Sequence, residues 1–373
     1  VSFDPRGTGG SAPINCPRWP EQPPGAPEPD LLDETGFATA SRLEQQFAQG
    51  CLQVLGERAP HFTTAATARD LDLLRIALGD DRLNYLGQSY GAKLGAEYAR
   101  RFPAAVRVAV LDAPSEPRGT LVQDLVRQAR GFEHTFDVYA AGCPERPACH
   151  LGRDPRAFVT RLVAKANKAA IASSARADAN PATGADVLDT VRGALYFSAS
   201  WSDLDEVLSD AWLGDSAGIF ALGRVVNWQE SADDAPADPV DANYVINCND
   251  SAPGPNAEQL RAEVRRLLRE APLFGPHTAG ALLSCVSWQP RRTPLADPVA
   301  AVANPLLVIG TVNDAATPYV GAVALTRVLG NARLLTWEGN NHTALAFSNC
   351  VAEHVARYLI EVVLPPDGAR CPA

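Results

Sequence analysis

A serine between two glycines is the pattern with the clearest chemistry in this chain of 373 residues. The pentapeptide Gly87-Gln88-Ser89-Tyr90-Gly91 follows an apolar run at 82–86 and precedes an alanine-rich stretch at 92–102 with helical apolar spacing. A serine hydroxyl is a weak nucleophile at neutral pH, so catalysis requires a fixed, exposed position beside a base, which a sharp strand-to-helix turn provides. We expect this turn to strain the backbone of Ser89 and to leave no room for a Cβ at either glycine.

An acid and a base should follow the serine, each in a loop directly after a strand, if the chain is an α/β-hydrolase. The apolar run 305–311 predicts a buried parallel strand and leads to Asp314, and the run 333–337 predicts another strand and leads to His342. In the expected mechanism His342 takes the Ser89 proton and returns it to the leaving group, while Asp314 orients the imidazole. Each residue alone is more often structural, but their order after three predicted strands favours a catalytic triad.

The strand and helix patterns divide the chain into two expected parts. Strand patterns, including a further run at 106–112, lie within 1–117 and 295–373, which we assign to an α/β-hydrolase domain with a mostly parallel sheet and helices on both faces. Between 118 and 294 the spacing is mostly helical, which predicts an inserted helical cap that shapes the substrate cavity. The predicted cap helices are 121–141, 155–172, 185–197, 201–213, 219–228 and 257–270.

Four segments and one cysteine carry a resemblance that covers nearly the whole chain. They are 1–11, 85–91, 314–319 and 341–343, with Cys371 near the end. Together they resemble the secreted tripeptidyl aminopeptidases of actinobacteria, a group that includes a cell-envelope serine protease of mycobacteria. The resemblance implies an α/β-hydrolase in which Ser89, Asp314 and His342 are the nucleophile, acid and base.

The sequence departs from this family at its first residues. Members of the family carry a Gly-Gly-Pro-Gly loop ahead of Asp4-Pro5-Arg6-Gly7, and that loop supplies one N–H of the oxyanion hole. No such loop is in the sequence, and Val1-Ser2-Phe3 has the pattern of the end of an interior strand. We therefore expect a preceding segment, in a larger precursor or as a separate polypeptide. The remaining oxyanion donor is the backbone N–H of Tyr90, and the loss of one donor typically slows hydrolysis about a hundred- to a thousandfold.

Composition excludes several classes of function. The chain is 46% hydrophobic and 20% charged, which is typical of a folded globular protein. Its net charge of −10, with both signs interspersed, gives no basic patch and argues against nucleic acid as a partner. No apolar run is long enough for an integral membrane segment. No metal-ligand spacing such as H-E-x-x-H is present, so we expect neither a metal nor another cofactor.

The eight cysteines form an even set without a CxxC pair, which favours disulfides over zinc and indicates an oxidising compartment. We therefore expect the protein to be secreted or held in the cell envelope. Counting leaves the pairing open, although neighbours in sequence are the simplest choice, and some cysteines could instead be free buried thiols. The resemblance implies the pairs Cys16 with Cys51, Cys143 with Cys149, Cys248 with Cys285, and Cys350 with Cys371.

The leading functional hypothesis is an exported serine exopeptidase that releases short peptides, such as tripeptides, from free N termini through an acyl-enzyme. Such an enzyme needs a carboxylate that binds the substrate ammonium, and we favour Asp250, because a cystine at Cys248 would fix its backbone. Glu230, Asp233 and Asp234 are alternatives. A carboxylesterase or lipase acting on small esters is the second hypothesis. The third is a truncated, non-catalytic chain that binds the missing segment.

Overall fold

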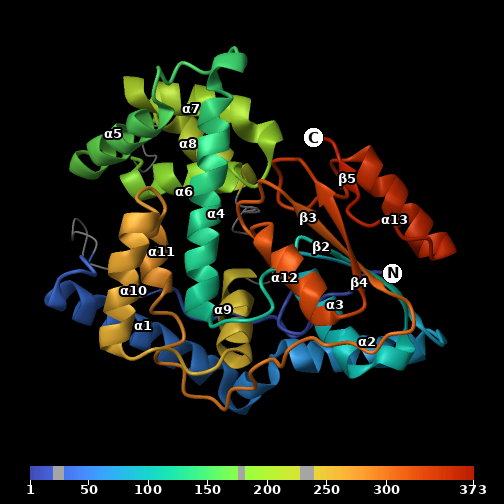
Figure 1. Ribbon diagram of the computed structural model, residues 1–373. Coiled ribbons are helices and arrows are strands. Elements are labelled where there is room, and N and C mark those ends of the chain that lie inside the picture. Colours follow the sequence, from blue (N-terminus) through green and yellow to red (C-terminus); the bar gives the residue numbers. More distant parts are fainter. Residues whose placement is uncertain (20–28, 175–180, 227–238) are drawn as a thin grey trace.

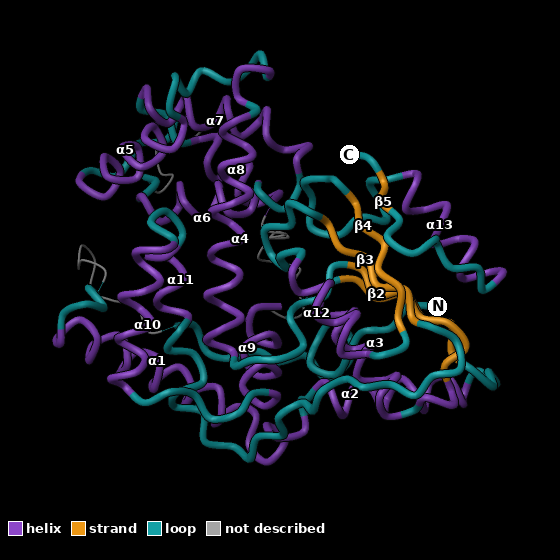
Figure 2. Tube along the Cα trace, viewed as in Figure 1, coloured by secondary structure: helices purple, strands orange, loops and turns teal. Residues whose placement is uncertain are grey.

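The computed structural model describes residues 1–19, 29–174, 181–226 and 239–373. Among these residues, five parallel strands form one sheet in the order β1-β2-β3-β4-β5, with helices packed on both faces (Figure 1). Figure 2 shows the strands side by side in one part of the molecule, with helices filling the other part. The strands are β1 (Leu83–Gln88), β2 (Val106–Asp112), β3 (Leu306–Thr311), β4 (Ala332–Trp337) and β5 (Arg370–Cys371).

The four predicted strands are present, each within two residues of its expected bounds. Every residue of β3 is buried, as its unbroken apolar run predicts for a parallel strand covered on both faces. Alternate residues of β2 point to opposite faces: Ala109 and Leu111 pack on the side of α3 and α12, and Val108 and Val110 on the side of α13. These helices are α3 (Tyr90–Arg101), α12 (Val320–Leu329) and α13 (Asn349–Glu361).

Residues 1–19 contain no strand, so the prediction that Val1-Ser2-Phe3 ends an interior strand is wrong. The backbone there pairs with no neighbouring strand, and Phe3 packs half-buried against the cluster on the α3 face. In the part of the chain that the structure describes, the α-helices α1 (Glu34–Leu55) and α2 (Thr64–Ala77) precede β1. The Arg6 guanidinium binds both carboxylate oxygens of Asp70 in α2 at 2.6 Å, which anchors the segment on this helix.

Between β2 and β3, every regular element of the described residues is a helix. They are α4 (Leu121–Ala141), α5 (Pro155–Lys168), α6 (Gly184–Ala194), α7 (Trp201–Leu213), α8 (Ala217–Val226), α9 (Pro239–Asp250), α10 (Ala257–Glu270) and α11 (Gly275–Ala281). Short 3-10 helices occupy Gly56–His61, Pro103–Ala105, Cys143–Glu145 and Ser198–Ser200. The predicted bounds of α4, α7 and α10 are confirmed, whereas α9 and α11 were not predicted.

This helical region contains more than one core. Helices α4 to α8 share one cluster of buried side chains. Figure 1 shows α5 to α8 grouped at the top, with α4 running down from them. In contrast, α9 packs on α1, where the rings of Tyr244 and Phe47 meet edge to face at 5.0 Å. Residues of 118–294 therefore share a core with residues of 1–117, and the division of the chain at 117 and 295 stays a prediction.

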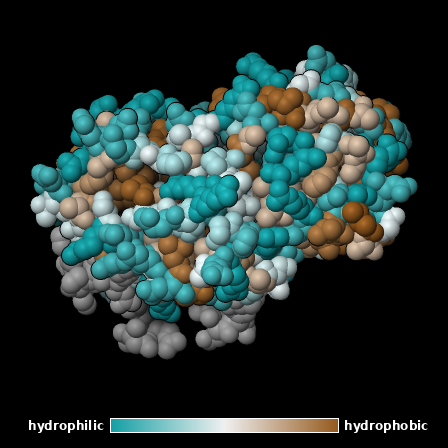
Figure 3. Space-filling model, turned by 90° about the horizontal axis from the view of Figure 1, so that it is seen from below, coloured by the Kyte–Doolittle hydropathy of each residue, from teal (hydrophilic) through white to brown (hydrophobic). Residues whose placement is uncertain are grey.

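Four disulfides link the cysteines of the described chain, and no described cysteine is free. The bonded pairs are Cys16–Cys51, Cys143–Cys149, Cys248–Cys285 and Cys350–Cys371, the same pairs that the family resemblance implies. In the described ranges, no helix combines the length and apolar character that crossing a bilayer requires. Figure 3 shows polar residues spread over one face of the molecule, interrupted by small apolar patches.

Candidate active site

Ser89 lies at the turn between β1 and α3, where its backbone has φ 54° and ψ −116°. This positive φ is the strained conformation expected of a nucleophile elbow. The turn depends on Gly87, because a Cβ there would lie 2.3 Å from the carbonyl oxygen of Gly91. The matching expectation for Gly91 is wrong, since the nearest atom to its Cβ would be the Tyr85 hydroxyl at 3.7 Å, an ordinary van der Waals contact.

The backbone around Ser89 is fixed by the neighbouring strand. The N–H of Ser89 donates to the carbonyl of Asp112 at the end of β2, at 2.9 Å. Tyr90 is the first residue of α3. The first N–H groups of a helix have no acceptor within the helix, so the Tyr90 N–H is available to a developing oxyanion.

Asp314 and His342 come together at the carboxyl ends of β3 and β4. The Nδ1 atom of His342 lies 3.0 Å from each carboxylate oxygen of Asp314. The carboxylate also accepts hydrogen bonds from the backbone N–H groups of Ala316 and Thr317, at 2.9 and 2.8 Å, and from the Thr317 hydroxyl, at 3.0 Å. These donors hold Asp314 in an orientation that can bind the imidazole.

The charge state of His342 is set by two opposing effects. Burial of the imidazole acts to lower its pKa, but the charge and hydrogen bond of Asp314, together with the charge of Asp112, outweigh burial. The pKa of His342 is therefore raised above its ordinary value. A base of raised pKa is well suited to accept a proton from a serine hydroxyl.

One expected contact is not formed. No hydrogen bond joins the Ser89 hydroxyl to the His342 ring, although both residues are described. Such bonds between nucleophile and base are often long in the free enzyme and tighten only in the complex with substrate. The structure thus brings Asp314 and His342 into contact, and Ser89 shares the same edge of the sheet.

The helical region holds the histidine loop in place. The His342 N–H donates to the carbonyl of Tyr196 at 2.8 Å, and the neighbouring Asn341 side chain accepts from the N–H of Ser198 at 2.7 Å. The Tyr196 ring stands edge-on against the imidazole, with ring centroids 5.4 Å apart. The sequence contained no signal for Tyr196 as part of the site, because it contributes through a backbone carbonyl and a ring face.

A cavity of about 620 Å³ opens at Ser89. Its walls come from the elbow, from α4 and α9, and from the loop that contains Thr317. Two of its lining carboxylates, Glu116 and Asp124, were not singled out from the sequence. This volume is within the range of small-molecule sites.

The two carboxylates differ in their partners. Asp124 forms an ion pair with Arg127. Glu116 is half-buried and forms no ion pair with another described residue. Burial raises the pKa of Glu116, against the opposing charge of Arg127 and a hydrogen bond from the backbone of Arg118. A partly desolvated carboxylate without a direct countercharge is a suitable site for a ligand cation.

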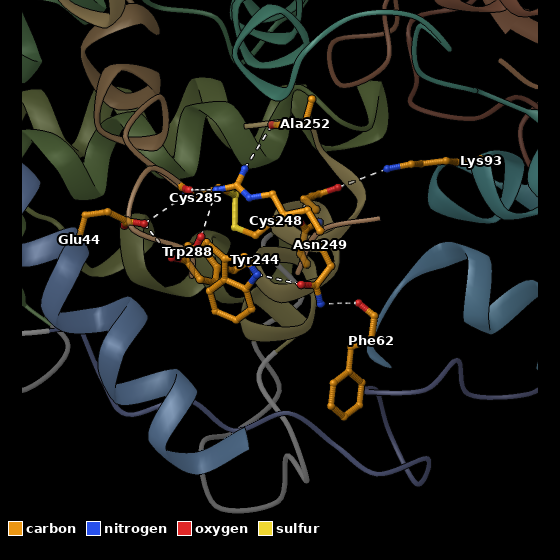
Figure 4. The surroundings of a disulfide bond; sticks show 12 residues. Glu44, Phe62, Lys93, Tyr244, Cys248, Asn249, Ala252, Cys285 and Trp288 are labelled. Carbon is orange, nitrogen blue, oxygen red and sulfur yellow. Dashed lines mark hydrogen bonds between the residues drawn. A yellow bond between two sulfur atoms is a disulfide. The ribbon is translucent and has the colours of Figure 1, made fainter. Parts of the chain in front are cut away.

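Asp250, the residue favoured from the sequence, is the last residue of α9 and follows Cys248 of the Cys248–Cys285 disulfide by two positions. Figure 4 shows the surroundings of this disulfide. Its side chain is 1% exposed and does not line the cavity. The carboxylate accepts from the hydroxyl and the N–H of Thr64, at 2.6 and 3.0 Å, and lies 3.7 Å from Lys93 Nζ. Its hydrogen-bonding capacity is therefore used within the protein, where it joins α9 to α2 and α3. The alternatives Glu230, Asp233 and Asp234 lie outside the described residues.

One group of potential metal ligands exists in the described ranges, formed by Cys350, His354 and Cys371. Its two sulfur atoms are bonded to each other in a disulfide. Because a cysteine binds metal as a thiolate, this group offers a single ligand and cannot hold an ion.

Comparison with known proteins identifies the family. A family model described as "TAP-like protein" matches residues 271–371, which include Asp314 and His342. Serine protease Hip1 of Mycobacterium tuberculosis is 34% identical, with 100% of this chain and 74% of that protein covered. Tripeptidyl aminopeptidase of Streptomyces lividans is 33% identical, with 96% and 68% covered. The chain belongs to this family of α/β-hydrolases. Carboxylesterase B of Mycobacterium tuberculosis, 33% identical with 100% of this chain and 73% of that protein covered, is a further relative.

Family membership confirms the fold class and the resemblance to tripeptidyl aminopeptidases and a mycobacterial serine protease. It makes this chain a serine hydrolase and leaves the non-catalytic hypothesis without support. The comparisons give no support to a separate N-terminal polypeptide. The four disulfides agree with an oxidising compartment.

Proposed function

We propose that this chain is an exported serine exopeptidase that releases short peptides, such as tripeptides, from free N termini. The observation that carries the proposal is that one cavity is lined by both Ser89 and the half-buried carboxylate Glu116. The first group attacks a carbonyl, and the second binds an ammonium at a fixed distance from it. Relatives named tripeptidyl aminopeptidase and serine protease support a peptide substrate.

In the proposed mechanism Ser89 attacks the scissile carbonyl while His342 accepts its proton. Asp314 stabilises the imidazolium through the two contacts to Nδ1, and the N–H of Tyr90 binds the developing oxyanion. His342 then protonates the leaving amine, which leaves an acyl-enzyme on Ser89. Water, activated by the same histidine, hydrolyses the acyl-enzyme and releases the short peptide.

We assign the binding of the substrate ammonium to Glu116 in place of Asp250. The charge of Asp250 is held by Thr64 and Lys93, and that of Asp124 by Arg127. Glu116 forms no ion pair within the described residues, although the charge of Arg127 and the backbone N–H of Arg118 act on it. An ammonium bound there would form a partly buried ion pair, and the loss of one partner of such a pair typically costs about 2 to 5 kcal/mol.

The test compares a tripeptide anilide carrying a free amino group with the same anilide after N-acetylation. We expect the free substrate to be strongly preferred. Glu116→Gln should lower kcat/KM for the free substrate by about 30-fold or more and leave the acetylated substrate unaffected. Asp250→Asn is the matched control and should keep the preference for a free amine. Equal rates for the two substrates in the wild-type protein would eliminate the exopeptidase function.

The alternative function is a carboxylesterase, which the relative named Carboxylesterase B favours. A serine triad cleaves amides and esters alike, so the fold does not separate the two. The separating measurement compares two values of kcat/KM. One is for the p-nitrophenyl ester of an N-acetylated peptide, and the other is for the tripeptide anilide with a free amino group. An esterase should prefer the neutral ester and show no effect of Glu116→Gln.

We also propose that the protein works outside the cytoplasm, secreted or in the cell envelope. The support is the complete pairing of the described cysteines in disulfides, which persist in oxidising compartments. Thiol titration of protein recovered from the envelope and the culture medium tests this proposal. Free thiols in all eight cysteines of the native protein would contradict it.

A further inference from the structure

Asp112, the last residue of β2, carries a buried carboxylate that the proposed mechanism does not use. The residue is 0% exposed. It accepts hydrogen bonds from the N–H groups of Ala344, at 3.0 Å, and Leu345, at 3.1 Å, and from the side chain of Gln88, at 3.1 Å. None of the Lys and Arg residues in the described ranges forms an ion pair with it. Several such donors are what stabilises an ionised carboxylate that lacks a countercharge.

The hydrogen bonds of Asp112 reach the proposed nucleophile and the turn that follows the proposed base. Ala344 and Leu345 are the second and third residues after His342, so the carboxylate holds the turn that follows the base. The backbone carbonyl of the same residue accepts the N–H of Ser89, at 2.9 Å. Asp112 thereby connects the elbow after β1 to the histidine loop after β4, two segments about 250 residues apart in the chain.

The charge of Asp112 also acts on the base. Burial lowers the pKa of His342, Asp314 raises it, and the charge of Asp112 raises it further. Burial raises the pKa of Asp112 above its ordinary value, and the charge of Asp314 acts in the same direction. The hydrogen bonds from Ala344, Gln88 and Leu345 oppose this shift without cancelling it. The titratable groups Asp314 and His342 both interact electrostatically with this carboxylate.

We infer that Asp112 is a second acidic positioning residue of the reaction, which fixes the turn after His342 against the strand end that carries Ser89. The inference rests on the proposed roles of Ser89 and His342. Through its side chain it keeps the imidazole in register with Asp314, and through its backbone it keeps the nucleophile at the same edge of the sheet. A displacement of about 1 Å in such an arrangement can slow the reaction about 10²-fold.

The test uses Asp112→Asn, which keeps one oxygen acceptor and removes the charge. Two readouts are measured across pH: the rate at which a fluorophosphonate labels the protein, and kcat/KM for the tripeptide anilide. We expect both to fall by about 10²-fold and their acid-side inflection to move to lower pH, because the imidazolium loses a stabilising charge. The control is Glu133→Gln, a buried carboxylate outside the cavity lining that accepts from the N–H groups of Leu273 and Phe274 at 2.7 and 2.9 Å.

The control should lower the melting temperature without moving the inflection. If Asp112→Asn does the same, Asp112 is structural and the inference is wrong. If Asp112→Asn does not fold, the exposed Gln88 decides: Gln88→Leu should slow labelling at an unchanged melting temperature, and an unchanged rate overturns the inference. A wild-type protein that is not labelled at all would contradict the proposed function itself, so the two failures are distinguishable.

Discussion

The Nδ1 atom of His342 lies 3.0 Å from each carboxylate oxygen of Asp314. Burial lowers the pKa of this imidazole, but the carboxylate charge and hydrogen bond raise it above the ordinary value of 6.5. The base is active only when neutral, so we expect hydrolysis to rise with pH through an inflection above 6.5. Asp314→Asn should lower kcat by about 10⁴-fold and move the inflection to lower pH. A wild-type inflection at or below 6.5 would contradict this account of the site.

The two glycines of the elbow should respond differently to a methyl group. Gly87→Ala places a Cβ 2.3 Å from the Gly91 carbonyl oxygen, whereas Gly91→Ala meets its nearest atom at 3.7 Å. We expect Gly87→Ala to lower the free energy of unfolding by about 3 kcal/mol, because the added methyl group overpacks against backbone. Gly91→Ala lies inside α3 and should be neutral or stabilising by up to about 1 kcal/mol. Thermal unfolding of the two variants measures the difference, and equal melting temperatures would show that the turn relaxes.

Glu44 of α1 should make the stability of the protein depend on pH. It is 3% exposed, and its Oε1 atom accepts from the Tyr244 hydroxyl and from the N–H of Cys285 (Figure 4). Burial raises its pKa from 4.5 to about 7, against these two hydrogen bonds. The folded state therefore favours the protonated form. The protonated Glu44 side chain contributes fully to the free energy of unfolding below pH 4.5, and this contribution is lost as the pH rises through about 7.

The size of this effect follows from the pKa difference of about 2.5 units, which corresponds to about 3 kcal/mol. Glu44→Gln keeps the Oε1 acceptor but cannot ionise. We expect its melting temperature to fall less than that of the wild type between pH 5 and pH 8. Glu353→Gln, at an exposed position of α13, is the control and should follow the wild-type curve. Identical pH dependence in all three proteins would refute the role of Glu44.

The disulfides should differ in their contribution to stability. Cys248–Cys285 closes a loop with a sequence separation of 37, and Cys143–Cys149 one of 6. Chain entropy predicts about 4 kcal/mol for the longer loop and about 2 kcal/mol for the shorter one. Replacing both cysteines of each pair by serine should therefore lower the melting temperature more for Cys248 and Cys285. The reverse order would indicate that native strain or residual structure decides the outcome.

The sequence predicted the strand ends better than the helical region. Carboxyl ends of parallel strands meet at one edge of a sheet, so short apolar runs were enough to bring Asp314 and His342 together. Helix α9 was missed because buried polar residues interrupt its apolar pattern: Asn249 binds the carbonyls of Ala59 and Phe62, and Asp250 binds Thr64. These partners lie 186 to 190 residues away, which no local pattern records.

Glu116 could not be predicted for a related reason. It lies in an irregular loop after β2, between Pro114 and Pro117, where no periodicity indicates which side chains face a cavity. Its relevance depends on α4 and the loop at Thr317, which complete the walls around it. The role of Asp112 was equally hidden, because a buried residue at a strand end has the same apolar surroundings in the sequence whether or not it holds a distant loop.

The most direct test of the account is to map the site of covalent labelling by a fluorophosphonate. The account predicts a single adduct, located by peptide mass spectrometry on the peptide that contains Ser89. Ser89→Ala should show no adduct and no hydrolysis, while it keeps the melting temperature of the wild type. Absence of an adduct in the active wild-type protein, or an adduct that persists in Ser89→Ala, would contradict the assignment of Ser89 as the nucleophile.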